Sequence, residues 1–300
     1  MVVTDLAQVV FSVPPEAAEA VSNLLSEEAG GVELRDVETS PDAGDAIELL
    51  AWLPTTDVDQ RVKQVETLLS SLTALGVKTA PWSWRSEEVD PASWTDAYKR
   101  YFTVNRIGKR FVVKPSWESY EAKPGELIIE MDPGMAFGTG LHASTRLVIH
   151  AMERVGRMGP APQSVVDLGC GTGILAIAAA RLWPSTRILA VDNDETAVRV
   201  CKENVQRNGL DGRIHVDLRA ASKVDGRYYL VLANLSPDAL TELHPRFRRI
   251  LDDFGRIVLS GLPAENAPAI CRLYTRDLSL EPEYSEELDG WQALLLRARD

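Results

Sequence analysis

Cysteine is scarce in this 300-residue chain, which contains only Cys170, Cys201 and Cys271. The three are odd in number, far apart and without a Cys-x-x-Cys spacing. Neither a disulfide framework nor a zinc site is therefore predicted, and we expect no bound metal. Reduced thiols of this kind are typical of cytosolic proteins.

Long apolar runs are also absent. No stretch approaches the roughly 18 consecutive apolar residues that a membrane-spanning helix requires. The first residues, MVVTDLAQVV, lack a basic segment followed by an apolar stretch and a cleavage site, so no secretory signal is predicted. Hydrophobic residues make up 45% of the chain and charged residues 25%, which is typical of a globular protein with a well-buried core. We expect a cytoplasmic protein without membrane contact.

Basic residues are few in the first third of the chain. Residues 1–90 contain 17 Asp and Glu against 5 Lys and Arg, a balance of −12, whereas the remaining residues contain 27 of each. An acidic segment repels nucleic-acid phosphate and attracts basic partners, so we expect no nucleic acid to bind. Solubility alone is an equally good explanation of this acidity.

The first 88 residues alternate between short strand patterns and amphipathic helix patterns. In order, the sequence predicts a strand at Leu6–Val13, a helix that Pro14-Pro15 opens and that runs to about Glu28, strands at Val32–Val37 and Ala46–Leu53, a helix at Asp57–Leu75 and a strand at Val77–Trp84. This β-α-β-β-α-β order predicts a small ferredoxin-like α+β domain. Such a fold does not define an activity by itself.

The rest of the chain divides into a connector and a larger domain. Residues 89–125 read as a structured connector, with a helix at Trp94–Tyr101 and a strand around Arg110–Lys114. Residues 126–300 begin with a strand at Glu126–Met131 and then alternate helices and strands, which predicts a doubly wound, mostly parallel sheet. Its central strands are predicted at Ser164–Leu168, Arg187–Val191, Ile214–Leu218, Tyr228–Ala233 and Arg256–Ser260.

The end of the chain differs from that pattern. Strands at Leu278–Tyr284 and Trp291–Arg297 are joined by the short acidic segment SEELDG, so they are expected to form an antiparallel hairpin.

The strongest chemical signal is the segment SVVDLGCGTGILAIAAA. An apolar strand ends in Asp167, glycines follow at Gly169, Gly171 and Gly173, and a helix of small residues begins at once. Glycines are needed where the backbone turns sharply and approaches a ligand closely. The dinucleotide fingerprint has the spacing G-x-G-x-x-G. Here the pattern D-x-G-x-G-x-G resembles motif I of methyltransferases that use S-adenosyl-L-methionine (SAM).

Two further polar residues are predicted at the ends of neighbouring strands. Asp192 ends the next strand, where a carboxylate can accept hydrogen bonds from both ribose hydroxyls. It could instead cap the following helix, a role that Asn193 or Asp194 could also fill. Asn234 ends the fourth strand, where its side-chain carbonyl and the following backbone carbonyl could hold a donor nitrogen. The alternative is a turn or cap residue before Ser236.

The segment MDPGMAFGTGLHASTRL, just before the glycine-rich turn, resembles the DPGxAFGTGxHxTT segment of the bacterial PrmA family, the methyltransferases of ribosomal protein L11. The resemblance continues through GCGTGILAIAA, VDND, ENVQRNG, VLANL and GRIVLSGL, and upstream through SWTDAYKRYF and VVKPSWE. It covers roughly residues 90–265 and is most specific around residues 132–145. It implies a class I SAM-dependent methyltransferase sheet that ends in the antiparallel hairpin.

The same resemblance implies roles for individual residues. Thr145, Gly169, Asp192 and Asn234 are expected to contact SAM, and Asn234 is also the expected catalytic residue. Phe137, Gly138 and Thr139 are expected in a loop that closes over the cofactor. The glycine-rich turn adds Asp167, Gly171 and Gly173 to the predicted cofactor-binding residues.

The resemblance also implies a substrate. The expected methyl acceptors are lysine ε-amino or N-terminal α-amino groups of a basic ribosomal protein, and the acidic domain at residues 1–88 would recognise it. Leu141, Ser236 and Pro237 depart from the family's usual residues at positions that the resemblance places toward the substrate.

Several conspicuous residues have simpler interpretations. His142 is expected to be a loop or packing residue, because it lacks a residue that would orient it as a base. Trp94, Trp117 and Tyr120 are interpreted as core or interdomain aromatics rather than a cage for cationic amines. Cys170 is interpreted as a small residue between glycines.

Three alternatives stay open. The first is a methyltransferase of the same fold that acts on another protein or on a small molecule. The second is a nicotinamide-dependent dehydrogenase, which the glycine spacing and the terminal hairpin disfavour. The third is a non-catalytic binding module that keeps the fold.

Overall fold

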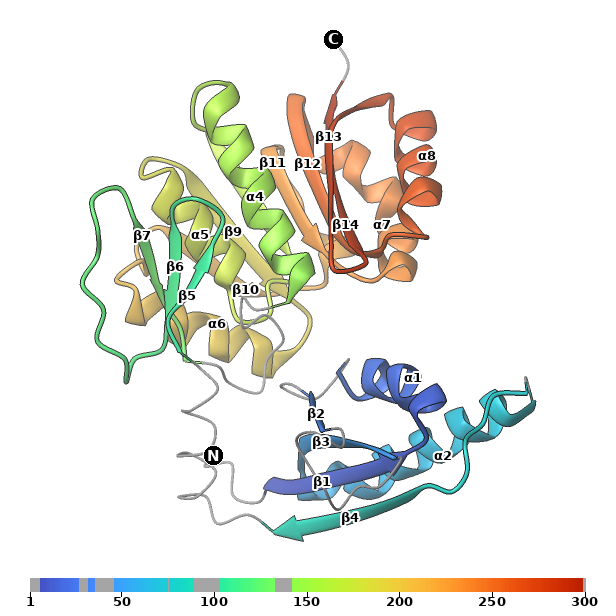
Figure 1. The fold of residues 1–300 in the computed structure, drawn as a ribbon. Helices are drawn as coiled ribbons and strands as arrows, with labels where there is room; N and C mark the ends of the chain where they lie inside the picture. The colour runs from blue at the N-terminus through green and yellow to red at the C-terminus, as the bar shows by residue number, and fades with distance from the viewer. Residues whose placement is uncertain are drawn as a thin grey trace. The chain divides into compact units, whose positions relative to one another are not determined.

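The computed structural model describes residues 6–26, 32–35, 46–74, 76–88, 103–132 and 142–298. The chain forms two compact units, residues 1–101 and residues 102–300, each with its own sheet and helices (Figure 1). Within the described residues, no helix is both long enough and apolar enough to cross a lipid bilayer.

The first unit contains a four-stranded antiparallel sheet with the strand order β2-β3-β1-β4. Its elements are β1 (Leu6–Val13), α1 (Pro15–Ser26), β2 (Val32–Arg35), β3 (Ile47–Pro54), the short 3-10 helix η2 (Thr55–Asp57), α2 (Val58–Ala74) and β4 (Ser83–Glu88). This is the predicted ferredoxin-like order. Alternate residues of β1, such as Val9 and Phe11, are fully buried together with Val21 of α1 and Val65 of α2. The period of two along the strand therefore explains which face the helices cover.

One strand of this unit lies later in the sequence than predicted. The expected strand at Val77–Trp84 is wrong for its first six residues, and β4 extends instead to Glu88. Pro81 has no backbone N–H to donate to a ladder, which explains why pairing with β1 begins only at Ser83. The predicted end of the first helix at Glu28 lies outside the described residues.

The second unit begins with a small sheet of three strands. β5 (Asn105–Ile107) and β6 (Phe111–Lys114) are antiparallel, and β7 (Leu127–Glu130) is parallel to β6. The sequence predicted β6 and β7 but missed β5. The carboxylate of Glu153 accepts hydrogen bonds from the backbone N–H groups of Lys109 and Arg110, which fixes this sheet to the long helix α4 (Ala143–Met158). The predicted helix at Trp94–Tyr101 lies outside the described residues.

The main sheet has seven strands in the order β10-β9-β8-β11-β12-β14-β13. Its strands are β8 (Ser164–Leu168), β9 (Arg187–Asp192), β10 (Ile214–Leu218), β11 (Tyr228–Asn234), β12 (Leu251–Pro263), β13 (Leu280–Leu288) and β14 (Trp291–Ala298). The first five in the spatial order are parallel, and β14 is antiparallel to both of its neighbours, β12 and β13. The fold is the α/β class that the sequence predicted.

Helices cover both faces of this sheet (Figure 1). The helices are α4, α5 (Ile174–Leu182), α6 (Glu195–Arg207), α7 (Pro237–Ile250) and α8 (Ala267–Asp277). Successive residues of one strand enter different cores: Leu230 packs with α4 and α5, whereas Val231 packs with α7 and α8. The near-continuous apolar strands of the sequence follow from burial on both faces.

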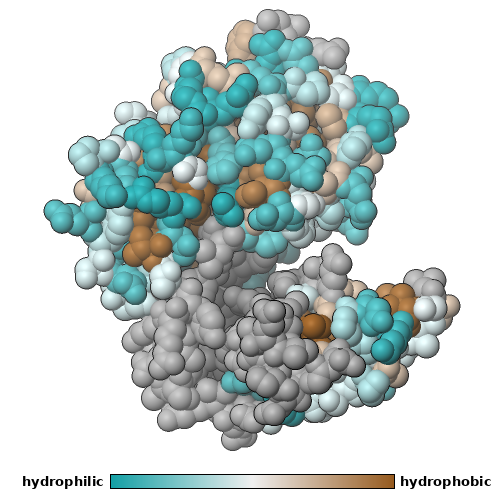
Figure 2. Space-filling view, viewed as in Figure 1, coloured by the Kyte–Doolittle hydropathy of each residue, from teal (hydrophilic) through white to brown (hydrophobic). Residues whose placement is uncertain are grey.

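The terminal hairpin is tighter than predicted. β13 continues through most of the SEELDG segment, so that only Asp289 and Gly290 connect the strands. Both have a positive φ, 51° and 77°, which matches a two-residue Asp-Gly hairpin turn. Hydrophilic side chains dominate the face of the second unit seen in Figure 2, where hydrophobic residues form small separate patches.

Candidate functional site

The candidate site lies at the carboxyl ends of β8, β9 and β11. From β8 the chain adds β9 and β10 on one side and then returns to add β11 on the other side, so the strand order reverses at β8. Open α/β sheets bind ligands at the carboxyl ends of the strands beside such a reversal. The turn between β8 and α5 contains Gly169, Gly171 and Gly173, with φ of 70°, 51° and 83°. This left-handed region favours glycine. A Cβ on Gly169 would lie 2.5 Å from Cδ2 of Leu235, and one on Gly173 would lie 2.5 Å from Sγ of Cys201. Backbone conformation and space both require glycine at these two positions.

The end of β9 holds this turn. The N–H groups of Gly169 and Cys170 both donate to the Val191 carbonyl at 2.9 Å, and Gly171 N–H donates to Oδ2 of Asp192 at 3.0 Å. Oδ1 of Asp192 accepts from the N–H of Asp194 at 3.1 Å. Each carboxylate oxygen keeps further acceptor capacity, and the side chain is half-buried, so Asp192 can still accept ribose hydroxyls.

Asp192 does not cap the helix that follows it. The residue that caps α6 is Asp194, whose carboxylate accepts from Thr196 N–H at 2.8 Å. The helix-capping role that the sequence left open for Asp192 is therefore filled by Asp194. The carboxylate of Asp192 stays at the glycine turn.

Asp167 is fully buried beneath the turn. Its Oδ2 accepts from the N–H of Ala176 in the first turn of α5 at 3.1 Å, and its Oδ1 is buried without a partner among the described residues. Burial raises the pKa of Asp167 to about 7, and the negative charge of Asp192 adds to this. We therefore propose that Asp167 supports the turn and the start of α5 from below.

The buried carboxyl predicts a pH-dependent stability. Because the folded pKa of Asp167 exceeds its ordinary value of 3.8, the free energy of unfolding should fall as pH rises from about 4 to about 7. In Asp167→Asn this decline should be smaller. At pH 8 the free energy of unfolding of Asp167→Asn should exceed that of the parent by about 2 kcal/mol. In the parent the charged carboxyl costs on the order of 4 kcal/mol, and in the variant the unpaired amide N–H costs about 2 kcal/mol.

Urea unfolding of the cofactor-free protein at pH 5 and pH 8 would measure this effect. Equal pH slopes in the parent and in Asp167→Asn would show that folding does not raise the pKa of Asp167.

Asn234 and Thr145 come together from elements far apart in the sequence. Thr145, only 1% exposed, lies in the first turn of α4, and its Oγ1 accepts from Nδ2 of Asn234 at 3.3 Å. Oδ1 of Asn234 is buried and has no partner among the described residues. A buried acceptor without a partner costs roughly 1–3 kcal/mol, so this oxygen is suited to receive a ligand N–H.

The capping alternative for Asn234 is also resolved. Ser236 caps α7 by accepting from Ala239 N–H at 3.3 Å, and Pro237 occupies the first helical position. These two residues explain the start of α7. The amide of Asn234 is left facing Thr145.

His142 has a structural role in the described region. It precedes α4, its Nδ1 accepts from the N–H of Ser144, and its ring lies edge-on to Trp291 with centroids 4.7 Å apart. Burial lowers the pKa of His142 below its ordinary value, which favours the neutral ring. The packing interpretation is confirmed, and Trp291 is a neighbour that the sequence did not indicate.

Other predicted residues lie elsewhere. Phe137, Gly138, Thr139 and Leu141, and also Trp94, fall outside the described residues. Cys170 is buried as a small residue of the turn. Trp117 and Tyr120 are half-buried.

Tyr120 lies outside the apolar core, and its alternative interpretation as an interdomain aromatic stays a prediction. Its hydroxyl donates to Glu126 at 2.7 Å and accepts from Arg106 at 2.8 Å. Tyr120 therefore belongs to a polar network on the small sheet.

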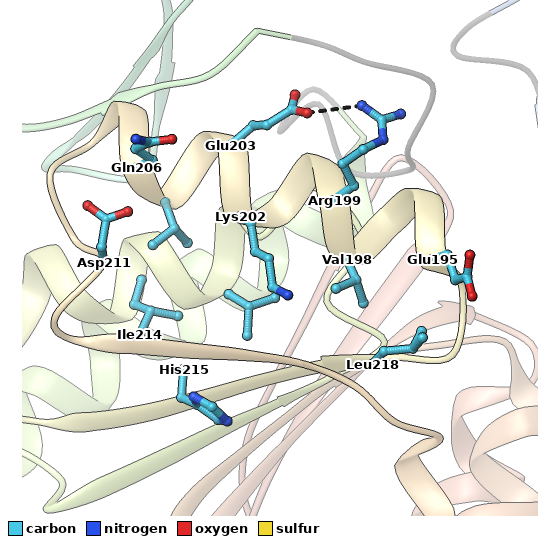
Figure 3. Close-up of a pocket in the computed structure, with 12 residues that line it drawn as sticks. Glu195, Val198, Arg199, Lys202, Glu203, Gln206, Asp211, Ile214, His215 and Leu218 are labelled. Carbon is cyan, nitrogen blue, oxygen red and sulfur yellow. Dashed lines mark hydrogen bonds and ion pairs between the residues drawn. The ribbon is translucent and has the colours of Figure 1, made fainter. Parts of the chain in front are cut away.

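A groove of about 730 Å³ lies between α6 and the edge strand β10 (Figure 3). Apolar side chains such as Val198 and Ile214 line its floor, and Arg199 forms an ion pair with Glu203 at 3.0 Å on its rim. None of the residues predicted to bind the cofactor lines this groove. This groove is therefore separate from the candidate site, which consists of the side chains and backbone groups at the ends of β8, β9 and β11.

Comparison with known proteins gives consistent matches. The family model described as ribosomal protein L11 methyltransferase (PrmA) matches residues 5–299. A ribosomal protein L11 methyltransferase of Pelotomaculum thermopropionicum is 35% identical over 313 aligned positions, which cover 97% of this chain and 98% of that protein. One of Symbiobacterium thermophilum is 35% identical over 300 positions, covering 93% and 94%. The crystal structure of a ribosomal protein L11 methylase from Lactobacillus delbrueckii subsp. bulgaricus aligns with a TM-score of 0.61 at 29% identity, over 66% of this chain and all of that one.

Proposed function

The chain belongs to the ribosomal protein L11 methyltransferase (PrmA) family, and we propose that it methylates amino groups of ribosomal protein L11. It is a methyltransferase that uses SAM. The observation that supports amine methylation most strongly is the buried Oδ1 of Asn234, which has no partner among the described residues and lies beside Thr145, at the strand end next to the glycine turn.

The described residues fit SAM. The left-handed turn at Gly169, Gly171 and Gly173 leaves no side chain between the backbone and a ligand, and Asp192 offers carboxylate oxygens to ribose hydroxyls. These residues would hold the nucleoside part. When bound, SAM supplies a methyl group that its positively charged sulfur has already activated for transfer.

The protein's chemical task is then to present a neutral amine in line with that methyl group. Oδ1 of Asn234 can accept one amine N–H, and Nδ2 is held by Thr145, so the amide has a fixed orientation. Removal of the amine from water lowers its pKa and favours the neutral nucleophile. An amide does not titrate, so Asn234 orients the amine without removing its proton.

The acidic first unit is proposed to recognise the substrate. Its first 90 residues carry a balance of −12, while the remainder is balanced, so long-range attraction of a basic protein would come from this unit. A ribosomal substrate also fits a cytoplasmic location. Opposite charges raise association rates most at low ionic strength, where the Debye length is roughly 30 Å at 0.01 M against about 8 Å at 0.15 M.

Neutralising exposed acids of the first unit should weaken methylation of the protein substrate. In Glu16→Gln/Asp59→Asn/Glu66→Gln, three exposed carboxylates are removed from α1 and α2, and kcat/KM for L11 should fall about 5- to 20-fold at 0.01 M salt. At 0.15 M salt the difference should shrink to about threefold or less, because screening removes the same attraction. The dissociation constant of SAM should not change.

The matched control is Glu242→Gln/Glu265→Gln/Glu287→Gln, which removes three exposed carboxylates from the second unit. If both triple variants lose activity equally, or neither does, the acidity of the first unit serves solubility and not docking.

Labelling identifies the substrate. The purified enzyme would be incubated with tritiated SAM and the total ribosomal protein of cells that lack this methyltransferase. Label in the L11 band supports the proposal. Label confined to another protein, or to small molecules, would favour a methyltransferase of the same fold with a different target.

A further inference from the structure

We infer that Ser260 and Gly261, at the carboxyl end of β12, are positioning residues for Asn234 in methyl transfer. The inference rests on the proposed role of Asn234. It concerns how the protein holds that amide, and neither residue is assigned a contact with the substrate.

Gly261 lies against the backbone of the residue that follows Asn234. Its φ is 79°, and a Cβ built on it would lie 2.9 Å from the carbonyl carbon and 3.0 Å from the nitrogen of Leu235, and closer still to the carbonyl oxygen. These are backbone atoms, which cannot rotate away as a flexible side chain can. Any side chain at position 261 would therefore displace Leu235, and with it the neighbouring Asn234.

Ser260 connects the same strand end to α4. Its carbonyl accepts from Leu235 N–H at 3.0 Å, and its hydroxyl donates to the carbonyl of Ser144 at 3.0 Å. The side chain is fully buried. One residue thus fixes both the backbone after Asn234 and the first turn of α4.

These contacts close a ring. Ser144 and Thr145 are neighbours in the chain, and Oγ1 of Thr145 accepts a hydrogen bond from Nδ2 of Asn234. Asn234 and Leu235 are also neighbours in the chain, and the N–H of Leu235 donates to the carbonyl of Ser260. Asn234 also pairs directly with Ser260 in the parallel register of β11 and β12. The amide is therefore held from its side chain and from its backbone by one connected set of contacts.

An irregularity in β12 occurs at this place. The register between β12 and β14 shifts between Leu259 and Leu262, so that Ser260 and Gly261 fall outside the regular pairing with the terminal hairpin. Such bulges are common beside active sites, where they redirect a side chain. Here the irregularity brings the hydroxyl of Ser260 to α4 and the α-carbon of Gly261 to Leu235.

The test compares two glycines with matched backbone conformation. Gly261 has φ 79° and Gly290 has φ 77°, but a Cβ on Gly290 would meet nothing within 4 Å. Gly261→Ala and Gly290→Ala therefore impose the same left-handed strain, which should lower Tm by about 2–4 °C, and Gly261→Ala should lose more because of its additional clash with Leu235. Only Gly261→Ala should move Asn234, and its kcat on ribosomal protein L11 should fall about 100-fold, the effect of roughly a 1 Å misplacement.

Two further readouts separate positioning from general damage. In Gly261→Ala the dissociation constant of SAM, measured by calorimetry, should rise far less than kcat falls, because the glycine turn after β8 and the carboxylate of Asp192 keep their own hydrogen bonds. Introducing Gly261→Ala into Asn234→Ala should reduce kcat by less than about threefold further, since residues that act through one another are not additive. Gly290→Ala should have the same small effect in both backgrounds.

Ser260→Ala is the second variant, in case Gly261→Ala does not fold. It removes only the hydroxyl bond to α4 and should lower kcat about tenfold, again with little further effect in Asn234→Ala. If Gly261→Ala or Ser260→Ala is as active as Gly290→Ala, or if its effect is fully additive with that of Asn234→Ala, the inference is wrong. A silent Asn234→Ala would instead remove the proposed catalytic role on which the inference rests.

Discussion

Replacing Gly171 with valine is expected to weaken SAM binding at least about 100-fold while the second unit stays folded. Gly171 has a φ of 51°, and its N–H donates to the carboxylate of Asp192. A β-branched residue strongly disfavours this conformation, so the turn would change shape, the link to Asp192 would be lost, and a side chain would stand where the backbone should approach the cofactor. Isothermal calorimetry of SAM binding measures the effect.

Gly209→Val provides the control. Gly209 is exposed, has a φ of 66°, and lies after α6 with open space around its Cβ position. Its valine variant should show a similar loss of stability and bind SAM normally. If folded Gly171→Val binds SAM as tightly as Gly209→Val, the turn is not the cofactor site.

Asn234→Ala and Asp192→Ala are expected to fall into different kinetic classes. Removal of the Asn234 amide should lower kcat at least about 100-fold with a small change in the KM for SAM, because the orienting acceptor acts on the amine as it reacts. Asp192→Ala should instead raise the KM for SAM at least about tenfold and change kcat less, since ribose hydrogen bonds exist in both ground and transition states.

Steady-state kinetics with SAM and ribosomal protein L11 varied separately would distinguish these classes. Asn234→Asp is a useful companion: it keeps an acceptor oxygen but replaces the donor to Thr145 with a negative charge, so it should recover only part of kcat. The assigned roles fail if both alanine variants show the same kinetic pattern.

Much of the fold could be predicted because its signals are local. β8 and β10 begin and end as expected, since an apolar run in β8 and an apolar-polar alternation in β10 are each bounded by turn residues. The ferredoxin-like order follows from two helical periods between four strands. β4 was misplaced because it is an edge strand whose residues Ser83–Ser86 are all exposed, so burial gives them no alternating pattern. β5 has only three residues, too few for a periodic signal.

Part of the candidate site could likewise be predicted from local sequence signals, and part could not. Asp167 lies near the end of β8, Asp192 and Asn234 end β9 and β11, and the glycines come after β8. Their position at the edge of the sheet could therefore be predicted from the sequence. The contacts of Ser260 and Gly261 with Leu235 and Ser144 could not, because they depend on the pairing of β11 with β12 and on a bulge. The only sequence signal was a Ser-Gly pair at a strand end. Trp291 is brought to His142 by the terminal hairpin, which no local pattern reveals.

The central claim is that the Asn234 site transfers methyl groups from SAM to amines of ribosomal protein L11. Mass spectrometry of purified, unmethylated L11 after incubation with SAM and the enzyme tests it most directly, with Asn234→Ala as the matched reaction. We predict peptides that gain one or more methyl groups on a lysine ε-amine or on the N-terminal α-amine, and almost none with Asn234→Ala. L11 that stays unmodified by a folded enzyme with bound SAM, or equal methylation by Asn234→Ala, would contradict the account.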